Sequence, residues 1–390
     1  MIIPIASIFQ IFSFVSVFLL PLFGISDILI NFNFIVLRVI LVLIRYLSNL
    51  NFPIFSLPTP NIFVIFIYYF AIYNLYKLKC LNKKLNRYKY IRNIKILKID
   101  IKIILTKTNL KLIRKVVMTS SVLTIIIYYL FIIYFENYIW YFNVQQGNMA
   151  IVKYQDTTIL FDFGSTTKNL AANVISNFLK AKNIHKIDYA VISHFHEDHV
   201  NAYEFLIKNN LIGSFIYTIP NEDNVNIYED FERSVNSYGI SSVIVKNLDK
   251  IKIGNINIDI LSPPYDCIIN SKDILNSNSI ISLISIKNKN FMFMGDATVE
   301  SEKYLIRNNI FKDEDIKEKL QNIEVLQVGH HGSITSTSDE FLNNIKANIG
   351  LISAKKEKYG HPHEDILKKL NIFNIKTHIT ENKGALKVKL

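Results

Sequence analysis

The sequence predicts an α/β domain of two sheets flanked by helices, preceded by an all-α transmembrane region. Short β-branched runs alternate with helix-like segments after Trp140, which is the order expected of layered sheets and helices. Apolar runs of nearly membrane-spanning length fill much of the chain before that point. Of the 390 residues, 50% are hydrophobic and 13% aromatic, which is rich for a purely soluble protein.

Four apolar runs approach the roughly 20 residues that cross a bilayer. They cover residues 2–23, 28–44, 61–76 and 116–134. The first has no basic segment before it and no small-residue cleavage site, so we interpret it as a retained helix rather than a signal peptide. The second contains Arg38 and the third follows Pro58 and Pro60, so each is either a membrane span or a buried or re-entrant helix.

The basic residues predict the orientation of these helices. Residues 1–136 contain 16 Lys and Arg against three acids, a net charge of +13, whereas the remainder has 28 basic and 29 acidic residues. Fourteen of the 16 lie in residues 77–115. Because short basic loops stay cytoplasmic, we expect a multi-pass protein of the cell membrane whose C-terminal part is extracytoplasmic. The loop is expected to face anionic membrane lipid, with a nucleic-acid contact as the alternative.

This pattern divides the chain into four parts. They are transmembrane helices at 1–76, a basic cytoplasmic loop at 77–115, a last transmembrane helix at 116–136 and a soluble domain at 138–390. Cys80 and Cys267 fall on opposite sides of the membrane, so they predict neither a disulfide nor a thiolate metal site. In the soluble domain we expect strands at 150–155, 157–164 and 187–193 and helices at 169–184 and 201–210, followed by further strands alternating with helices.

A dense group of metal-ligating side chains follows the predicted strand 187–193. His194, His196, Asp198 and His199 lie within six residues, although the chain has nine histidines in all. Imidazole and carboxylate bind Zn²⁺ and Mn²⁺ without any thiol. Four such groups exceed the usual share of one ion from one loop. The spacing therefore indicates two divalent metal ions, Zn or Mn, rather than a polar loop with fortuitous histidines.

The segment HFHEDH resembles the metal-binding signature of the metallo-β-lactamase fold, an αββα sandwich. The segment ILFDFG then implies that Asp162 orients a metal ligand from outside the ligand shell. FMFMGDA implies that Asp296 bridges both metals, and VLQVGHHGS implies that His330 or His331 completes the second ion. Two such ions promote hydrolysis, in which Asp198 is expected to act both as a ligand and as a catalytic group.

Four longer segments resemble the C-terminal domain of DNA-internalisation competence proteins of the ComEC type. They are WYFNVQQGNMAIVKYQDTTILFDFG, NSNSIISLISIKNKNFMFMGDA, VLQVGHHGS and YGHPHEDIL, and the resemblance covers about residues 138–390. The apolar runs are similar to the last transmembrane helices of that family. The resemblance implies a nuclease or phosphodiesterase that degrades one strand of incoming DNA outside the membrane. His361 and His363 are then expected to contact or protonate a substrate phosphate, although His363 also suits a helix start.

The sequence departs from the family pattern at several positions. The family's D-V-G-Q-G-D segment is replaced at residues 143–148 by NVQQGN, and a Gly-Gly pair by Asn201 and Ala202. Most hydrolases of the wider fold also have a separate histidine for the first metal, whereas no histidine lies between His199 and His330 here. Asn276 or Asn278 stands at that place, as the resemblance to the competence branch implies, and we expect Asn278 outside the first metal's shell. His194, His196 and Asp296 would then hold that metal.

These patterns leave three functions open. The first is the membrane-anchored nuclease, with single- or double-stranded DNA as its substrate. The second is a non-catalytic DNA-binding component of an uptake channel, and the third is an ectophosphodiesterase for small nucleotides. The family's N-terminal domain and further helices have no counterpart here, so we expect either a reduced form of the family or half of a split gene, in which a separate subunit supplies the missing channel helices and N-terminal domain. The near-neutral soluble domain is weak evidence against DNA binding, with Lys355, Lys356 and Lys358 as a local basic patch.

Overall fold

A computed structural model describes Arg38 and residues 62–84, 90–96, 99–105, 107–220, 225–263 and 268–390. The chain divides into two compact units, Met1–Ser56 and Leu57–Leu390. The predicted apolar runs 2–23 and 28–44 lie outside the described residues, except for Arg38. Cys267 also lies outside them.

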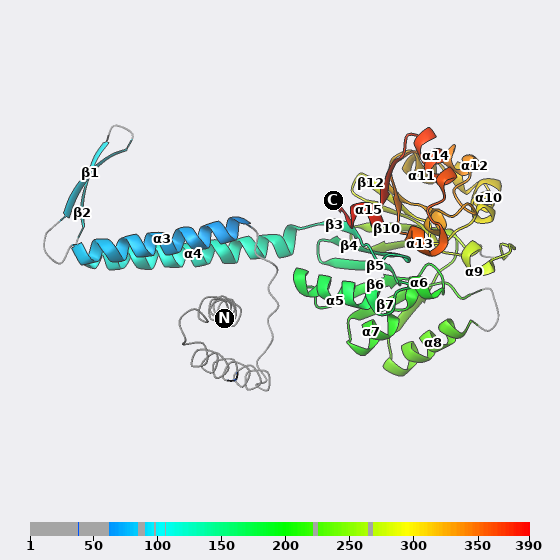
Figure 1. The fold of residues 1–390 in the computed structure, drawn as a ribbon, viewed down its shortest axis with the longest axis horizontal. Coiled ribbons are helices and arrows are strands. Elements are labelled where there is room, and N and C mark those ends of the chain that lie inside the picture. Colours follow the sequence, from blue (N-terminus) through cyan, green and yellow to red (C-terminus); the bar gives the residue numbers. More distant parts are fainter. Residues whose placement is uncertain are drawn as a thin grey trace, which may run out of the picture. The chain divides into compact units, whose positions relative to one another are not determined.

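The first described elements are two long helices that pack together, with a hairpin between them in sequence (Figure 1). They are α3 (Ile62–Lys84), β1 (Tyr90–Ile96), β2 (Ile99–Leu105) and α4 (Lys107–Phe135). Large apolar side chains such as Phe66, Tyr69 and Leu123 are exposed on these helices. Within the described residues, however, no helix combines the length and hydropathy that a membrane crossing requires.

The segment 77–115, predicted as a basic cytoplasmic loop, contains this hairpin and the ends of both helices. β1 and β2 pair antiparallel from Tyr90 opposite Leu105 to Ile96 opposite Ile99. Isoleucines alternate with polar residues along the facing ends of both strands, and this period of two favours a strand. Both helices are longer than the apolar runs from which they were predicted. Basic residues extend them, because lysine and arginine favour the helix and leave its backbone hydrogen bonds intact.

The remaining residues form two seven-stranded sheets. The first has the order β16-β3-β4-β5-β6-β7-β8 and is parallel from β5 to β8. Its strands are β3 (Tyr138–Tyr141), β4 (Met149–Tyr154), β5 (Thr157–Phe163), β6 (Ile187–Val191), β7 (Ile212–Tyr217), β8 (Ser241–Ile244) and β16 (Leu386–Lys389).

The second sheet has the order β15-β14-β13-β12-β11-β10-β9 and is parallel from β12 to β15. Its strands are β9 (Lys250–Ile253), β10 (Ile256–Ser262), β11 (Ile281–Ile286), β12 (Lys289–Phe293), β13 (Ile323–Gln327), β14 (Ala347–Ile352) and β15 (Lys376–Ile379). Both sheets agree with the strand-rich, alternating pattern of the sequence.

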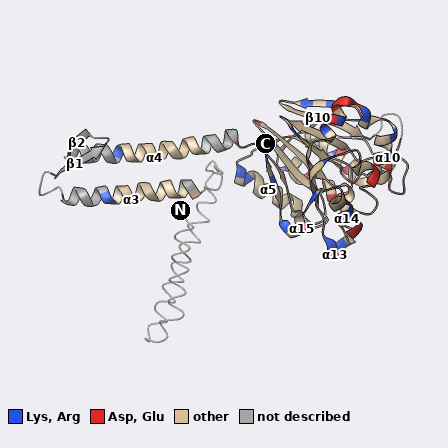
Figure 2. Ribbon diagram, turned by 90° about the horizontal axis from the view of Figure 1, so that it is seen from above, with Lys and Arg blue, Asp and Glu red and all other residues tan. Residues whose placement is uncertain are grey.

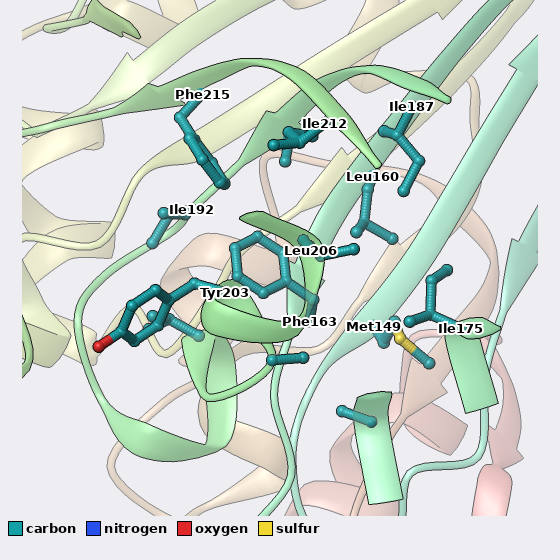
Figure 3. Packing of buried hydrophobic residues seen from close by; sticks show 14 of the residues in the cluster. Met149, Leu160, Phe163, Ile175, Ile187, Ile192, Tyr203, Leu206, Ile212 and Phe215 are labelled. Atoms are coloured by element: carbon teal, nitrogen blue, oxygen red, sulfur yellow. The ribbon is translucent and has the colours of Figure 1, made fainter. Parts of the chain in front are cut away.

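Helices cover the outer face of each sheet, which gives the predicted αββα sandwich. The helices α5 (Leu170–Lys182), α7 (Tyr203–Lys208) and α8 (Asn226–Tyr238) pack on the first sheet, and Figure 3 shows part of this core. The helices α10 (Val299–Arg307), α11 (Glu314–Leu320) and α14 (Glu364–Ile372) pack on the second. A third core lies between the two sheets.

Strand β5 shows how the sequence builds these layers. Ile159 and Phe161 belong to the core between the sheets, whereas Leu160 and Phe163 belong to the core under the helices. All four are at least 96% buried. A strand covered on both faces needs a continuous apolar run rather than an alternating one, as TTILFDF provides. The parallel strands then bring their carboxyl ends to one edge of each sheet.

Candidate metal centre

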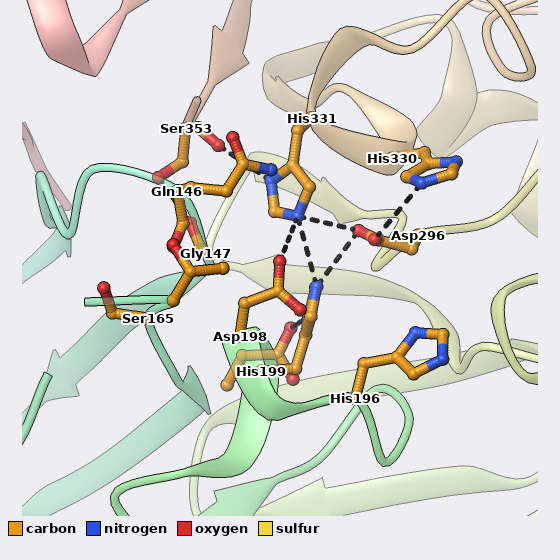
Figure 4. A network of polar contacts seen from close by, with 12 residues as sticks. Gln146, Gly147, Ser165, His196, Asp198, His199, Asp296, His330, His331 and Ser353 are labelled. Carbon is orange, nitrogen blue, oxygen red and sulfur yellow. Dashed lines mark hydrogen bonds and ion pairs between the residues drawn. The ribbon is translucent and has the colours of Figure 1, made fainter. Parts of the chain in front are cut away.

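The predicted ligands meet where parallel strands of both sheets end (Figure 4). Asp162 lies at the end of β5, and the segment from His194 to His199 follows β6 and enters the short helix α6 (Glu197–Val200). Asp296 follows β12, and the 3-10 turn η3 (Gly329–Gly332) follows β13. Loops at such edges allow side chains from distant parts of the sequence to converge.

Two glycines allow other loops to pack directly behind Asp198. A Cβ on Gly147 would lie 2.7 Å from the Asp198 carbonyl oxygen, and one on Gly164 would lie 2.2 Å from its carbonyl carbon. The Asn148 N–H also donates to the Asp198 carbonyl oxygen at 3.1 Å. Because the neighbours are backbone atoms, a side chain at either glycine could not be accommodated by a rotamer change.

Hydrogen bonds fix the tautomers of two histidines. Asp162 accepts from the Ser193 N–H at 2.8 Å, from the Ser193 hydroxyl at 2.9 Å and from Nδ1 of His199 at 2.8 Å. The Ser353 carbonyl accepts from Nδ1 of His331 at 2.7 Å. Since a carboxylate and a carbonyl only accept, each Nδ1 carries the proton, and each Nε2 presents a lone pair to the centre.

When both imidazoles are neutral, these lone pairs converge with no hydrogen between them. The two Nε2 atoms of His199 and His331 lie 3.3 Å apart, and Asp296 Oδ1 lies 3.1 Å from the first and 3.4 Å from the second. Asp198 Oδ2 lies 3.3 Å from His331 Nε2. Asp296 Oδ1 is buried yet makes no hydrogen bond of acceptable geometry. Acceptors facing one another at these distances fit a bound cation.

Two overlapping sets of side chains therefore have metal-ligating geometry. His194, His199 and Asp296 form one, and Asp198, His199 and His331 form the other, each with its ligand atoms within 4.8 Å of one another. His196 adjoins the first set, with its Nδ1 2.9 Å from His194 Nε2. The donors are nitrogen and oxygen, as Zn²⁺ and Mn²⁺ accept.

The electrostatics of the centre also favour positive charge. Burial opposes protonation of His199, but the carboxylates of Asp296 and Asp162 outweigh it and raise the pKa of His199. Burial likewise opposes a charge on His331, and Asp296 and Asp198 raise its pKa. Burial alone would raise the pKa of Asp296, but the histidine charges hold it well below its ordinary value. Protons thus occupy a place that a metal ion would also suit.

The structure separates the two neighbouring histidines of the η3 turn. His331 is 2% exposed and points into the cluster, whereas His330 lies at its rim, with Nε2 3.8 Å from Asp296 Oδ2. Nδ1 of His330 contacts the Thr335 hydroxyl at 2.9 Å, and Nε2 lies 3.3 Å from Nδ2 of Asn276. The sequence had left the two histidines equivalent.

The two asparagines also differ. Asn278 forms three hydrogen bonds with the backbone of Ile269 and Ile274, so its side chain braces a loop instead of contacting a ligand. Asn276, in α9 (Ile274–Ser277), is the one that reaches His330 at the rim, and its Oδ1 is buried without a hydrogen bond. Asn276, rather than the predicted Asn278, is therefore the asparagine that lies beside the candidate metal ligands.

The two histidines of YGHPHEDIL take different places as well. The ring of His361 lies 5.9 Å from that of His330, and partial burial, followed by the charges of His330 and His331, lowers the pKa of His361 to about 4. His363 is the N-cap of α14, where its Nδ1 accepts from the Asp365 N–H at 3.3 Å. The structure thus favours the helix-start interpretation of His363 over a catalytic one.

Comparisons with known proteins agree with this architecture. The sequence model of the metallo-beta-lactamase superfamily matches residues 142–218. ComE operon protein 3 of Bacillus subtilis is 25% identical over 265 residues, which cover 63% of this chain and 32% of that protein. Recombination protein 2 of Haemophilus influenzae is 25% identical over 251 residues, which cover 63% of this chain and 28% of that protein.

The chain is a homologue of these competence proteins. The resemblance predicted from its motifs is confirmed, and the chain spans about a third of the length of these two relatives. An uncharacterized protein of Methanocaldococcus jannaschii is 26% identical over 219 residues, which cover 78% of that protein. Among solved structures, the metallo-beta-lactamase fold protein YhfI of Bacillus subtilis matches 65% of this chain over 100% of its own length, with a TM-score of 0.44 and 12% identity.

Proposed function

We propose that this protein is a membrane-anchored, metal-dependent phosphodiesterase or nuclease of a DNA-uptake system. One observation carries the hydrolytic part of the proposal. Nε2 of His199, Nε2 of His331 and Oδ1 of Asp296 face one another, and hydrogen bonds to Asp162 and the Ser353 carbonyl fix the tautomers of the two histidines. Such a centre suits divalent cations and, in this fold, hydrolysis.

Two divalent ions, Zn or Mn, would be held by four histidines and two aspartates. His194, His196 and Asp296 would hold one ion, and Asp198, His199, His331 and Asp296 the other. When bound, the ions would supply charge that polarises a phosphoryl group and lowers the pKa of water. His330 and Asn276 would remain at the rim of the centre, where a substrate approaches.

The reaction would be the hydrolysis of a phosphodiester. The oxygen of water bonds to phosphorus, the bond between phosphorus and the leaving ester oxygen breaks, and that oxygen takes a proton. The products are a phosphomonoester and a free hydroxyl group. Asp198 would orient the water. His361, which is neutral at pH 7 because its pKa is lowered, suits a hydrogen bond to a phosphate oxygen better than proton donation.

The biological setting in our proposal follows from the two competence relatives. DNA is the proposed substrate, and the domain is proposed to lie outside the cell membrane. The apolar runs of the N-terminal part and the exposed apolar side chains of α3 and α4 support a contact with lipid. The chain spans about a third of the length of those relatives, and we propose a separate channel subunit as a partner.

The test uses the full-length protein in detergent, supplied with Mn²⁺ or Zn²⁺ and given end-labelled single- and double-stranded DNA. We expect cleavage that EDTA and Asp198→Ala abolish. Asp188→Asn is the matched control, because Asp188 accepts a backbone N–H of Thr158 on the same sheet away from the centre. DNA binding without cleavage would identify a non-catalytic uptake component. Hydrolysis of small nucleotide diesters with indifference to polymer length would identify an ectophosphodiesterase.

A further inference from the structure

An exposed aromatic ring stands beside the metal centre and has no part in the proposed hydrolysis. Tyr359 ends the short helix α13 (Lys356–Tyr359) and is 57% exposed. Its ring lies 6.3 Å from that of His361, which lies 5.9 Å from that of His330. His330 in turn lies 3.8 Å from Asp296. A row of rings thus leads from the centre to the surface.

The loop that carries this ring is fixed to the metal-binding turn. The His363 N–H donates to the Gly332 carbonyl at 2.9 Å. Pro362 packs so closely that a Cβ on Gly332 would lie 2.8 Å from the proline Cβ. Because Gly332 directly follows His331, the segment from Tyr359 to His363 is positioned by the same turn that places the proposed ligand.

The surroundings of Tyr359 carry positive charge suited to a polyanion. Lys356 and Lys358 are exposed on α13, whose basic residues are blue in Figure 2. Lys358 Nζ lies over one face of the Tyr359 ring, 5.5 Å from its centroid. The helix also carries Glu357, whose carboxylate pairs with Lys355 at 3.6 Å. An aromatic face flanked by lysines is the arrangement on which bases of single-stranded nucleic acids stack.

We propose that Tyr359 is a stacking platform for an unpaired base next to the phosphate that the metal centre cleaves. This inference rests on the proposed function and specifies its substrate as single-stranded nucleic acid. In a duplex both faces of each base are already covered by neighbouring bases, so the ring can accept only a base that has left the stack. His361, between the platform and the centre, is placed to contact the intervening phosphate.

The test is a binding cycle that needs no cleavage. Full-length wild type and Tyr359→Ala are mixed, in EDTA, with fluorescent single-stranded oligonucleotides in which one abasic position is moved along the strand. We expect Tyr359→Ala to weaken binding of the intact strand about tenfold, equivalent to about 1.4 kcal/mol. One abasic strand should bind the wild type as weakly as the intact strand binds Tyr359→Ala. For that strand, Tyr359→Ala should not weaken the affinity further.

Two variants control for surface and hydroxyl effects. Tyr359→Phe keeps the ring and should bind as wild type. Tyr238→Ala removes a similarly exposed tyrosine, 56% against 57%, at the end of α8, and should also bind as wild type. Losses that add at every abasic position, or no binding of single strands by wild type, would overturn the platform. A coupled loss in a protein that cleaves no DNA would retain the platform and overturn the nuclease proposal.

Discussion

Replacing Asp162 with asparagine tests whether tautomer control underlies metal binding. The carboxylate is 4% exposed and accepts three hydrogen bonds, one at Oδ1 from the Ser193 N–H and two at Oδ2, from the Ser193 hydroxyl and His199. Asparagine has the same shape but only one accepting oxygen. The Ser193 N–H cannot become an acceptor, whereas the hydroxyl and the imidazole can. The amide oxygen should therefore stay with Ser193 N–H, and the amide nitrogen should face His199.

The Asp162→Asn substitution would move the proton of His199 from one ring nitrogen to the other. Nδ1 would accept from the new amide, so the proton moves to Nε2, which is the atom that faces His331 and Asp296. A protonated Nε2 cannot bind a metal ion. Loss of such an outer partner weakens metal affinity by about 10- to 100-fold, or about 1.4 to 2.8 kcal/mol. We expect Asp162→Asn to fall in this range.

The assay is a competition titration of Zn²⁺ or Mn²⁺ against a chelator of known affinity, with Asp188→Asn as the control. Asp188 accepts one backbone N–H at 2.7 Å and touches no proposed ligand, so its replacement should leave metal affinity within about twofold of wild type. Circular dichroism of both variants verifies that the fold is intact. An Asp162→Asn affinity equal to that of the control would refute the tautomer argument.

Three further predictions concern stability. Gly164→Ala should destabilise the protein by about 1 to 3 kcal/mol in denaturant unfolding, because the new Cβ would lie 2.2 Å from the Asp198 backbone. Gly239→Ala is the control: its Cβ would have no neighbour within 4 Å, so this variant measures only the cost of a positive φ. In EDTA, the melting temperature should fall as the pH rises above 6.5. Because the pKa values of His199 and His331 are raised, their protonation stabilises the folded state below pH 6.5, and this stabilisation is lost as the pH rises through the raised pKa values. Bound metal should abolish the fall in melting temperature. The same slope with and without metal would contradict this prediction. Burial raises the pKa of Glu302 to about 7, although the carboxylate accepts two backbone N–H groups. As the pH rises from 4.5 to 7, the wild type should therefore lose up to about 3 kcal/mol of folding stability, and Glu302→Gln should not. Parallel pH profiles of stability for the two proteins would refute this.

The sequence could predict the elements with strong local patterns. Residues 187–193 are mostly apolar and are followed by three histidines within six residues, so the sequence predicted both the buried strand and the group of ligands. The sandwich followed from alternating strands and helices. The β1–β2 hairpin was missed because its high density of lysine and arginine indicates a solvated loop, although its isoleucines alternate with polar residues at a period of two.

Other features depend on contacts between distant residues. Nothing local distinguishes His330 from His331, because the choice is made by the Ser353 carbonyl, 22 residues away and at the end of another strand. Asn276 and Asn278 are likewise equivalent in sequence until the loop at Ile269 engages one of them. The α14 cap explains His363, and the pattern of His363 followed by two acids was the available signal.

The departures at residues 143–148 leave the centre supported through backbone contacts. The family pattern has acids at the positions of Asn143 and Asn148, yet Asn148 still donates its N–H to the Asp198 carbonyl. The Gly147 carbonyl accepts from the Ser353 hydroxyl, and Ser353 in turn orients His331. Main-chain groups are the same whatever the side chain, so a loop without both acids can still position Asp198 from one sheet and His331 from the other. Gly147 must be retained, because its backbone lies close to that of Asp198. Losses confined to these side chains are therefore compatible with a metal centre that retains its geometry.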